Sequence, residues 1–245
     1  DPIVDSDLIR QQPLYSSGIA SGAHHAPPPN EYVWAGKERI VCNSPRRSKF
    51  VASKLIVPSE PAEFAAEGFV AFSGQVTGDI EGIVVLGDST ILFTRREIWE
   101  VSGSGPGRNG VGEFFAARRI SNAGGLVADG WRSLLETDEG VFFQRNTTQL
   151  CMLTKSGGVE WIGEPIEDYL EDFPVIVAST YIPSKHTAAF AVQATDGLTG
   201  GILRFDLQHK AWFFDNVGVV ASIAEYQGRL AYIQAGIVYV QDAAP

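Results

Sequence analysis

The sequence is poor in cysteine, in basic residues and in long apolar runs. Its apolar stretches fall far short of the roughly 20 residues that a membrane-spanning helix requires, so we expect no membrane insertion. Cys42 and Cys151 are the only cysteines and stand more than a hundred residues apart. Both lie among strand residues, so buried free thiols are the favoured interpretation, and the redox compartment stays open.

The N-terminus lacks a recognisable processing signal. Residues 1–10 carry three acidic side chains and no apolar core, so no secretory signal peptide is visible. Met152 is the only methionine, so the chain has no initiator. We expect a processed product, an excised domain or part of a longer protein.

Basic residues are outnumbered by acidic ones. The chain has 19 Lys and Arg against 29 Asp and Glu, which gives a formal net charge of −10. A surface with this charge does not bind phosphates broadly, which argues against stable nucleic-acid binding. The charge is compatible with a negative wall that DNA slides past without sticking.

What the sequence does contain is a cassette of short apolar strands and tight polar turns that recurs along the chain. The clearest copy covers residues 82–101, with Gly87, Asp88 and Ser89 as its first turn. The first turns of five copies lie at residues 36, 87, 139, 184 and 228, which are 51, 52, 45 and 44 residues apart. A propeller blade takes about 40 to 50 residues, so the spacing predicts one four-stranded blade per copy.

We therefore predict an all-β fold, a β-propeller of about five to six blades, over residues 31–245. Residues 1–30 are polar, small or proline-rich and are expected to form an extended N-terminal arm. A strand from the other terminus closes many such rings, and residues 8–14 are the candidate.

Two segments interrupt the repeat. Residues 161–173 place Ile162, Ile166 and Leu170 at helical spacing and predict the one short helix of the fold. The other segment is a glycine-rich loop, which we take as a candidate assembly loop because its glycines let a neighbouring backbone approach closely. Its residues are Ser102, Gly103, Gly105, Pro106, Gly107, Arg108, Asn109, Gly110 and Gly112.

The same loop contains a G-x-G-x-x-G string at 105–110, which in a dinucleotide-binding fold positions pyrophosphate at a helix N-terminus. Here the string is followed by neither a crossover helix nor the required acidic residue. An inter-blade or inter-subunit loop is therefore favoured over a nucleotide site, and we expect no cofactor.

Side chains suited to metal binding or catalysis are present but lack partners in the sequence. Five carboxylates share the helical segment, yet helical spacing spreads them over a solvated arc, so we expect no metal site there. They are Glu164, Glu167, Asp168, Glu171 and Asp172. A second acidic group, at 136–139, is explained by turn chemistry.

The histidines also lack supporting residues. His24 and His25 have no third ligand nearby, and His186 stands near Ser184 without a nucleophile elbow or an acidic partner. We expect no catalytic residue and no enzymatic activity.

Tryptophans close or precede the copies at residues 34, 99, 161 and 212, while Trp131 follows Gly130. Aromatic side chains at matched places in blades pack between neighbouring sheets, so a packing role is favoured. Stacking on a carbohydrate is the functional alternative.

Seven strings stand in a fixed order along the chain. They are QPLYSSG (12–18), LGD (86–88), ILFTRREIWEVSG (91–103), GPGRNG (105–110), RIS (119–121), DEGVFFQ (138–144) and WIGEPIE (161–167). Through them, residues 10–170 resemble the β-propeller of bacteriophage tail nozzle proteins, the tail tubular protein B family. The match thins after Pro174, and family members are much longer, so the chain would correspond mainly to their propeller.

The resemblance implies a structural component of the virion that forms a homo-oligomer, a hexamer in the family. It implies a place in the phage tail, adaptor and tail fibre proteins as partners, and DNA that passes through a channel without sequence-specific binding. The alternative is a carbohydrate-binding or adhesive propeller. A propeller glycosidase ranks below both, because the sequence shows no paired carboxylates that converge on one site.

Overall fold

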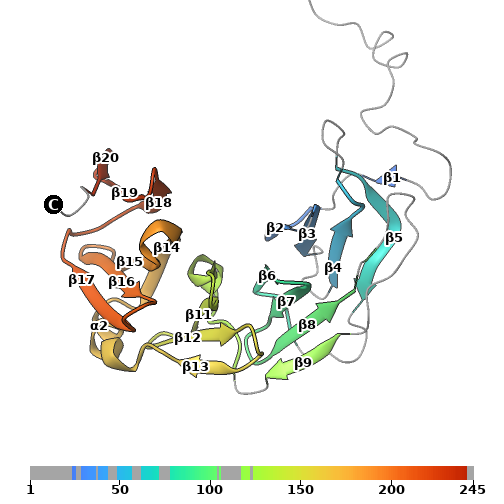
Figure 1. Cartoon of the computed structure of the whole chain (residues 1–245), viewed down its shortest axis with the longest axis horizontal. Coiled ribbons are helices and arrows are strands. Elements are labelled where there is room, and N and C mark those ends of the chain that lie inside the picture. The colour runs from blue at the N-terminus through green and yellow to red at the C-terminus, as the bar shows by residue number, and fades with distance from the viewer. Residues whose placement is uncertain are drawn as a thin grey trace, which may run out of the picture. The chain divides into compact units, whose positions relative to one another are not determined.

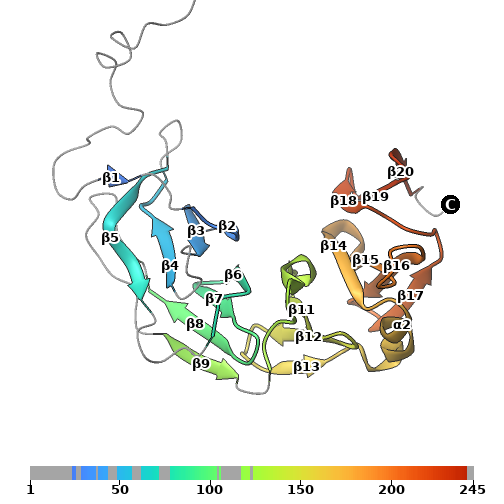
Figure 2. The ribbon, with the colours of Figure 1, turned by 180° about the vertical axis from the view of Figure 1, so that it is seen from behind.

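The computed structural model describes residues 24–25, 29–36, 38–43, 49–56, 62–71, 78–103, 105, 117–121 and 124–241. Two compact units are present, one of Asp1–Val76 with Val101–Ala117 and one of Thr77–Glu100 with Arg118–Pro245. Figures 1 and 2 show the strands from two sides. Among the described residues, no helix is long and apolar enough to cross a membrane.

The first unit contains one antiparallel sheet, sheet A, with the strand order β1-β5-β4-β3-β2. Its strands are β1 (His24–His25), β2 (Val33–Gly36), β3 (Arg39–Asn43), β4 (Lys49–Ser53) and β5 (Phe64–Ala71). Cys42, Val51 and Phe64 form its buried cluster. His24 and His25, which belong to the predicted arm, pair with the start of β5. The candidate closing strand at 8–14 lies outside the described residues.

The second unit contains four sheets whose strands follow one another in chain order. Sheet B has β6 (Gly82–Leu86), β7 (Ser89–Phe93), β8 (Ile98–Ser102) and β9 (Arg118–Ser121), and sheet C has β10 (Leu135–Glu136), β11 (Gly140–Asn146), β12 (Gln149–Thr154) and β13 (Val159–Trp161). Sheet D has β14 (Val175–Ile182), β15 (Thr187–Gln193), β16 (Gly200–Asp206) and β17 (Ala211–Asp215). Sheet E has β18 (Ser222–Tyr226), β19 (Arg229–Gln234) and β20 (Ile237–Val240).

An antiparallel meander that recurs in this way is the blade of a β-propeller, and the predicted all-β propeller fold is confirmed. Five sheets lie in the described part of the chain. The first turns of the predicted copies fall between adjacent strands of one sheet in each case, for example Gly87 and Asp88 between β6 and β7.

The core of the second unit lies between successive sheets, because strand residues alternate between two covered faces. Phe143 points towards sheet B and contacts Phe93, with ring centroids 5.1 Å apart. Phe142 points towards sheet D and contacts Phe190 and Phe205 at 5.6 and 5.7 Å. A strand buried on both faces reads as a continuous apolar run, which is why β11 lacks the polar alternation of a surface strand.

Two glycines are required by the backbone of sheet B. Gly87 turns β6 into β7 with a φ of +56°, a conformation that other residues adopt only with strain. At Gly125, a Cβ would lie 1.8 Å from the carbonyl oxygen of Thr94. The chain that leaves β9 therefore runs directly against the β7–β8 connection, and no other residue fits there.

The predicted helix exists but is shorter than residues 161–173. Trp161 is instead the end of β13 and pairs with Cys151, while Gly163 donates its backbone N–H to Leu150. A 3-10 turn, η2 (Glu164–Ile166), leads into α2 (Glu167–Asp172). The pattern missed this start because sheet pairing overrides helical spacing over the first residues.

Candidate functional site

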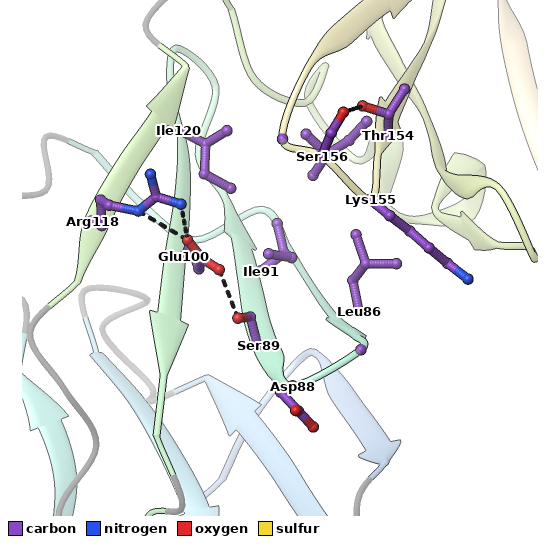
Figure 3. A pocket seen from close by; sticks show the side chains of 13 residues that line it. Leu86, Asp88, Ser89, Ile91, Glu100, Arg118, Ile120, Thr154, Lys155 and Ser156 are labelled. Atoms are coloured by element: carbon purple, nitrogen blue, oxygen red, sulfur yellow. Dashed lines mark hydrogen bonds and ion pairs between the residues drawn. The ribbon is translucent and has the colours of Figure 1, made fainter.

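A cleft of about 250 Å³ opens where one end of sheet B separates from sheet C. Figure 3 shows its side chains. It is lined by Leu86, Gly87, Asp88, Ser89, Ile91, Glu100, Arg118, Ile120, Leu153, Thr154, Lys155, Ser156 and Gly157. All belong to the second unit.

One wall is a row of polar side chains that crosses three strands of sheet B. Ser89 on β7 donates its hydroxyl to Glu100 Oε1 at 2.6 Å. Arg118 on β9 donates Nε to Glu100 Oε2 at 3.0 Å, and its Nη2 also donates to that oxygen. These hydrogen bonds, from Ser89 first and then Arg118, lower the pKa of Glu100, so its carboxylate stays ionised.

The floor of the cleft is apolar. Ile91 is buried, and Leu86 and Ile120 are half-buried beside it. Ile91 and Phe93 share one face of β7 because side chains two residues apart point the same way. The floor therefore continues the packed contact between sheets B and C out to the surface.

The opposite wall is the β12–β13 turn of sheet C. Thr154 Oγ1 lies 2.9 Å from Ser156 Oγ and accepts the backbone N–H of Gly158 at 3.1 Å. Lys155 is exposed, and its charge acts on the Glu136 carboxylate, where it partly offsets the rise in pKa that burial causes. Figure 3 places Lys155 and Arg118 on opposite sides of the floor.

The cleft lies beside the base of the predicted assembly loop. Glu100 and Arg118 are directly paired strand residues, and they are the last such pair before the chain leaves β8 for that loop. Ser102, Gly103 and Gly105 are described, whereas the predicted loop residues Pro106 to Gly112 lie outside the described residues. Opposite charges at 100 and 118 are the signal for this pair that the sequence contains.

His186 and His209 each lie in an exposed turn. His186 is exposed, and Ser184 donates its hydroxyl to the carbonyl of Gly228. His209 Nδ1 lies 2.8 Å from Asp206, a contact between neighbours in one exposed turn. The helical carboxylates project from α2 and η2, and no group of three or more His, Cys, Asp or Glu in the described ranges is arranged to hold a metal ion.

The acidic turn at 136–139 joins sheet C to sheet D, in addition to forming the turn itself. Asp138 accepts the Tyr181 hydroxyl at 2.6 Å, and Glu139 accepts Lys210 Nζ at 3.0 Å. Burial and the hydrogen bond to Asp138 raise the pKa of Tyr181 to about 12. The turn therefore helps to hold two blades together.

One tryptophan, Trp212, packs between sheets C and D as predicted, and Trp99 is buried. Trp99 donates Nε1 to Glu97 at 3.1 Å. Trp212 packs on Phe205 at 4.7 Å and donates Nε1 to the carbonyl of Ile162.

The packing prediction is wrong for Trp161, and Trp131, which stands outside the matched positions, is exposed as well. Trp131 and Trp161 are 43% and 40% exposed. Trp161 ends the outer strand β13, and Trp131 lies in the 3-10 turn η1 (Gly130–Ser133) with the Arg132 guanidinium 4.8 Å from its ring centroid. Trp34 on β2 is half-buried.

Both cysteines are buried free thiols, as expected. Burial raises the pKa of Cys42 to about 11 and also raises the pKa of Cys151. Neither thiol is therefore a reactive nucleophile at neutral pH.

Sheet E presents a second surface of interest. Strand pairing places eight residues on its face away from sheet D, namely Ser222, Ala224, Tyr226, Arg229, Ala231, Ile233, Val238 and Val240. All but Ala231 are exposed, and Val238 is 66% exposed. We call this set the outer face of sheet E. Its composition matches a blade face that packs against another sheet.

No protein-family model matches the sequence, and no curated protein matches it. The computationally designed protein Ika4 is 14% identical, with 69% of this chain and 93% of that chain covered and a TM-score of 0.43. A nidogen/laminin complex chain is 9% identical over 80% of this chain and 67% of its own length, with a TM-score of 0.48. A luciferin-regenerating enzyme is 13% identical over 87% and 56%, with a TM-score of 0.34. These are β-propeller structures, and the propeller assignment of this chain rests on its own strand order.

Proposed function

We propose that the protein is a structural component of a phage tail that acts by assembly with further copies of itself and with other tail proteins. Two lines support the proposal. The first is the resemblance of the strings over residues 10–170 to tail nozzle propellers. The second, which carries it, is the outer face of sheet E.

That face is costly to leave in water. Ile233 and Val238 are directly paired on it, and Val240 lies on the same face, two residues after Val238. Fully burying an exposed side chain of this size contributes about 1.5–3 kcal/mol, and Ile233, Val238 and Val240 are 37, 66 and 39% exposed, so covering all three would contribute roughly 2–4 kcal/mol. Contiguous exposed apolar surface of this kind marks protein interaction sites.

The charge distribution fits a second copy as the occupant. The chain carries a net charge of −10, so two copies repel each other over most of their surfaces. The outer face of sheet E has no acidic side chain, and Arg229 is its only charged residue. An interface formed there avoids like-charge contacts between carboxylates.

The first test is the mass of the purified protein in solution, measured by native mass spectrometry. We expect an oligomer, a hexamer if the family resemblance holds. The double variant Ile233→Lys with Val238→Lys should shift the mass towards the monomer. Leu198→Lys is the matched control, because Leu198 is an isolated exposed apolar residue outside this face and should leave the mass unchanged.

A stable monomer that never joins a virion would overturn the proposal. An oligomer that the double lysine variant leaves intact would overturn the assignment of the outer face of sheet E alone. The same resemblance supports three further parts of the proposal. The protein would be located in the phage tail, and its partners would be adaptor and tail fibre proteins. DNA would pass by without sequence-specific binding.

The predicted assembly loop has its own test. Deleting residues 102–112 should leave a folded domain and should impair tail assembly. The readout is the fraction of complete tails in electron micrographs of phage carrying the deletion. Unchanged virions would remove the loop from the proposal.

A carbohydrate-binding propeller is the second candidate function. The observation that favours it is the exposure of Trp131 and Trp161, because a flat indole ring stacks on a sugar. Trp212, in contrast, is packed against Phe205 and is not offered to a ligand. A glycan array decides the matter: binding that is lost in Trp131→Ala or Trp161→Ala would support this candidate, and an array without signal would remove it.

A further inference from the structure

The cleft between sheets B and C combines an apolar floor with cationic donors on both sides. Leu86, Ile91 and Ile120 lie between Arg118 and Lys155 in Figure 3. We propose that the cleft is a socket for one aliphatic side chain of a partner protein, held in place by carboxylates that flank this side chain in the partner. The inference deepens the proposed assembly function, because it names the chemistry by which a partner segment is recognised.

The size of the cleft favours a single side chain. Pockets for drug-sized ligands and cofactors measure about 300–1,000 Å³, and this one has about 250 Å³. An apolar floor enclosed by polar groups resembles the small pockets that receive anchor residues at protein interfaces. The floor side chains themselves offer only apolar contact. The nearby hydroxyl groups are bonded within their own walls, Ser89 to Glu100 on one side and Thr154 to Ser156 on the other.

The cationic side chains retain donors for a ligand. Arg118 gives Nε and Nη2 to Glu100, its Nη1 has no hydrogen-bond partner in the described part of the chain, and its side chain is 73% exposed. Glu100 thereby fixes the guanidinium at the edge of the floor, which lowers the entropy lost when a second carboxylate binds. Lys155 lines the other wall, where Figure 3 shows its ammonium extended past Leu86 and away from the floor. A carboxylate at the cleft would bind it through rotation of this flexible, exposed side chain.

The net charge of the chain does not prevent this recognition. At physiological ionic strength the screening length is about 8 Å, so distant carboxylates contribute little to an ion at the cleft. A bound carboxylate would sense Arg118 and Lys155 first. Glu100 is already compensated by Arg118, and Asp88 lies on the exposed β6–β7 turn at the rim.

The test uses three capped tripeptides as probes, titrated while the backbone amide signals of the protein are followed by NMR. Acetyl-Glu-Leu-Glu-amide should shift the signals of Gly87, Ile120 and Gly157 in a saturable way. Acetyl-Gln-Leu-Gln-amide keeps the aliphatic group without the charges, and acetyl-Glu-Ala-Glu-amide keeps the charges without the branched side chain. Each control should bind about threefold to tenfold more weakly.

Variants of the two cations locate the binding. Arg118→Gln and Lys155→Gln should each weaken the binding of acetyl-Glu-Leu-Glu-amide about threefold, as expected for exposed ion pairs. Lys185→Gln, in the exposed turn between β14 and β15, is the matched control and should leave it unchanged. Equal binding of all three probes, or no saturable shift at the cleft, would overturn the socket.

The two proposals fail in different ways. An oligomeric protein that binds none of the probes loses the socket and keeps the assembly function. Saturable, charge-dependent binding by a protein that stays monomeric and never enters a virion keeps the socket and removes the assembly function.

Discussion

Sheets D and E are both antiparallel meanders whose strands follow chain order, yet only sheet D is covered on both faces. All five central residues of β15 in sheet D are buried, with Phe190 facing sheet C and Ala189 and Ala191 facing sheet E. In β19 of sheet E, Leu230 is buried while Ile233 is exposed. Both faces of sheet E are nevertheless apolar, so the sequence provides for a contact that the described residues of the second unit do not make.

The comparison separates two reasons for an apolar strand residue. In sheet D the residues stabilise the fold itself, because their burial joins neighbouring blades. On the outer face of sheet E the same residue types contribute little to the isolated unit. Substitutions that are equivalent in chemistry should therefore have unequal effects on the free energy of unfolding, and four of them test this directly.

The largest effect is expected at Phe190. Its ring is fully buried and contacts Phe142 and Trp212. Phe190→Ala should lower the free energy of unfolding by about 3–5 kcal/mol, through lost burial and a cavity between sheets C and D. Urea denaturation followed by tryptophan fluorescence measures it. If Phe190→Ala lowered the free energy of unfolding by less than an alanine substitution at an exposed position does, sheets C and D would not be packed as described.

Overpacking gives the next effect. Ala191 is fully buried against sheet E, and a larger side chain has no room there. Ala191→Leu should destabilise by about 1–3 kcal/mol. Ala224 stands on the outer face of sheet E, and Ala224→Leu should be tolerated in the monomer. Equal losses in the two variants would contradict the difference between the sheets.

The polar contact between sheets C and D predicts a dependence on pH. The pKa of Tyr181 is raised to about 12 in the folded protein, above its ordinary value of 10.0. The stabilisation is therefore complete below pH 10 and is lost as the pH rises towards 12. Tyr181→Phe should cost about 0.5–1.5 kcal/mol at neutral pH, and the difference from the unmodified protein should shrink between pH 10 and 12.

Lysine side chains also lose their protons between pH 10 and 12 and change the stability of both proteins. The informative quantity is therefore the difference in free energy of unfolding between Tyr181→Phe and the unmodified protein at each pH. Titrations in urea at several pH values supply it. A difference that stays constant up to pH 12 would mean that Tyr181 does not ionise in the way that its contact with Asp138 requires.

The fold was predictable because its signals are local. Turn residues such as Gly87, and β-strand runs such as 141–143, specify short antiparallel strands without any knowledge of their neighbours. The start of the helix was not predictable in this way. Ile162 fits helical spacing, but the pairing of Trp161 with Cys151 depends on residues ten positions earlier in the chain.

The cleft was missed for a related reason. Its polar row joins Ser89, Glu100 and Arg118, and the last two are separated by the glycine-rich loop. Only the strand register shows that they are opposite one another. Sequence spacing likewise could not tell the packed Trp212 from the exposed Trp161, because that difference depends on whether a neighbouring sheet covers the residue.

The smallest effect on stability is expected at Val238, and it is the sharpest test of the comparison. Val238 is 66% exposed on the last strand of sheet E, so Val238→Ala removes little buried surface from the monomer. The free energy of unfolding at low protein concentration should change by less than about 0.5 kcal/mol. If a second copy covers this face, the same variant should lower the midpoint of unfolding at high protein concentration, since association stabilises the folded state by mass action. A loss of several kcal/mol at low concentration would show that Val238 is already buried within one chain, and the outer face of sheet E would then belong to the fold and not to an interface.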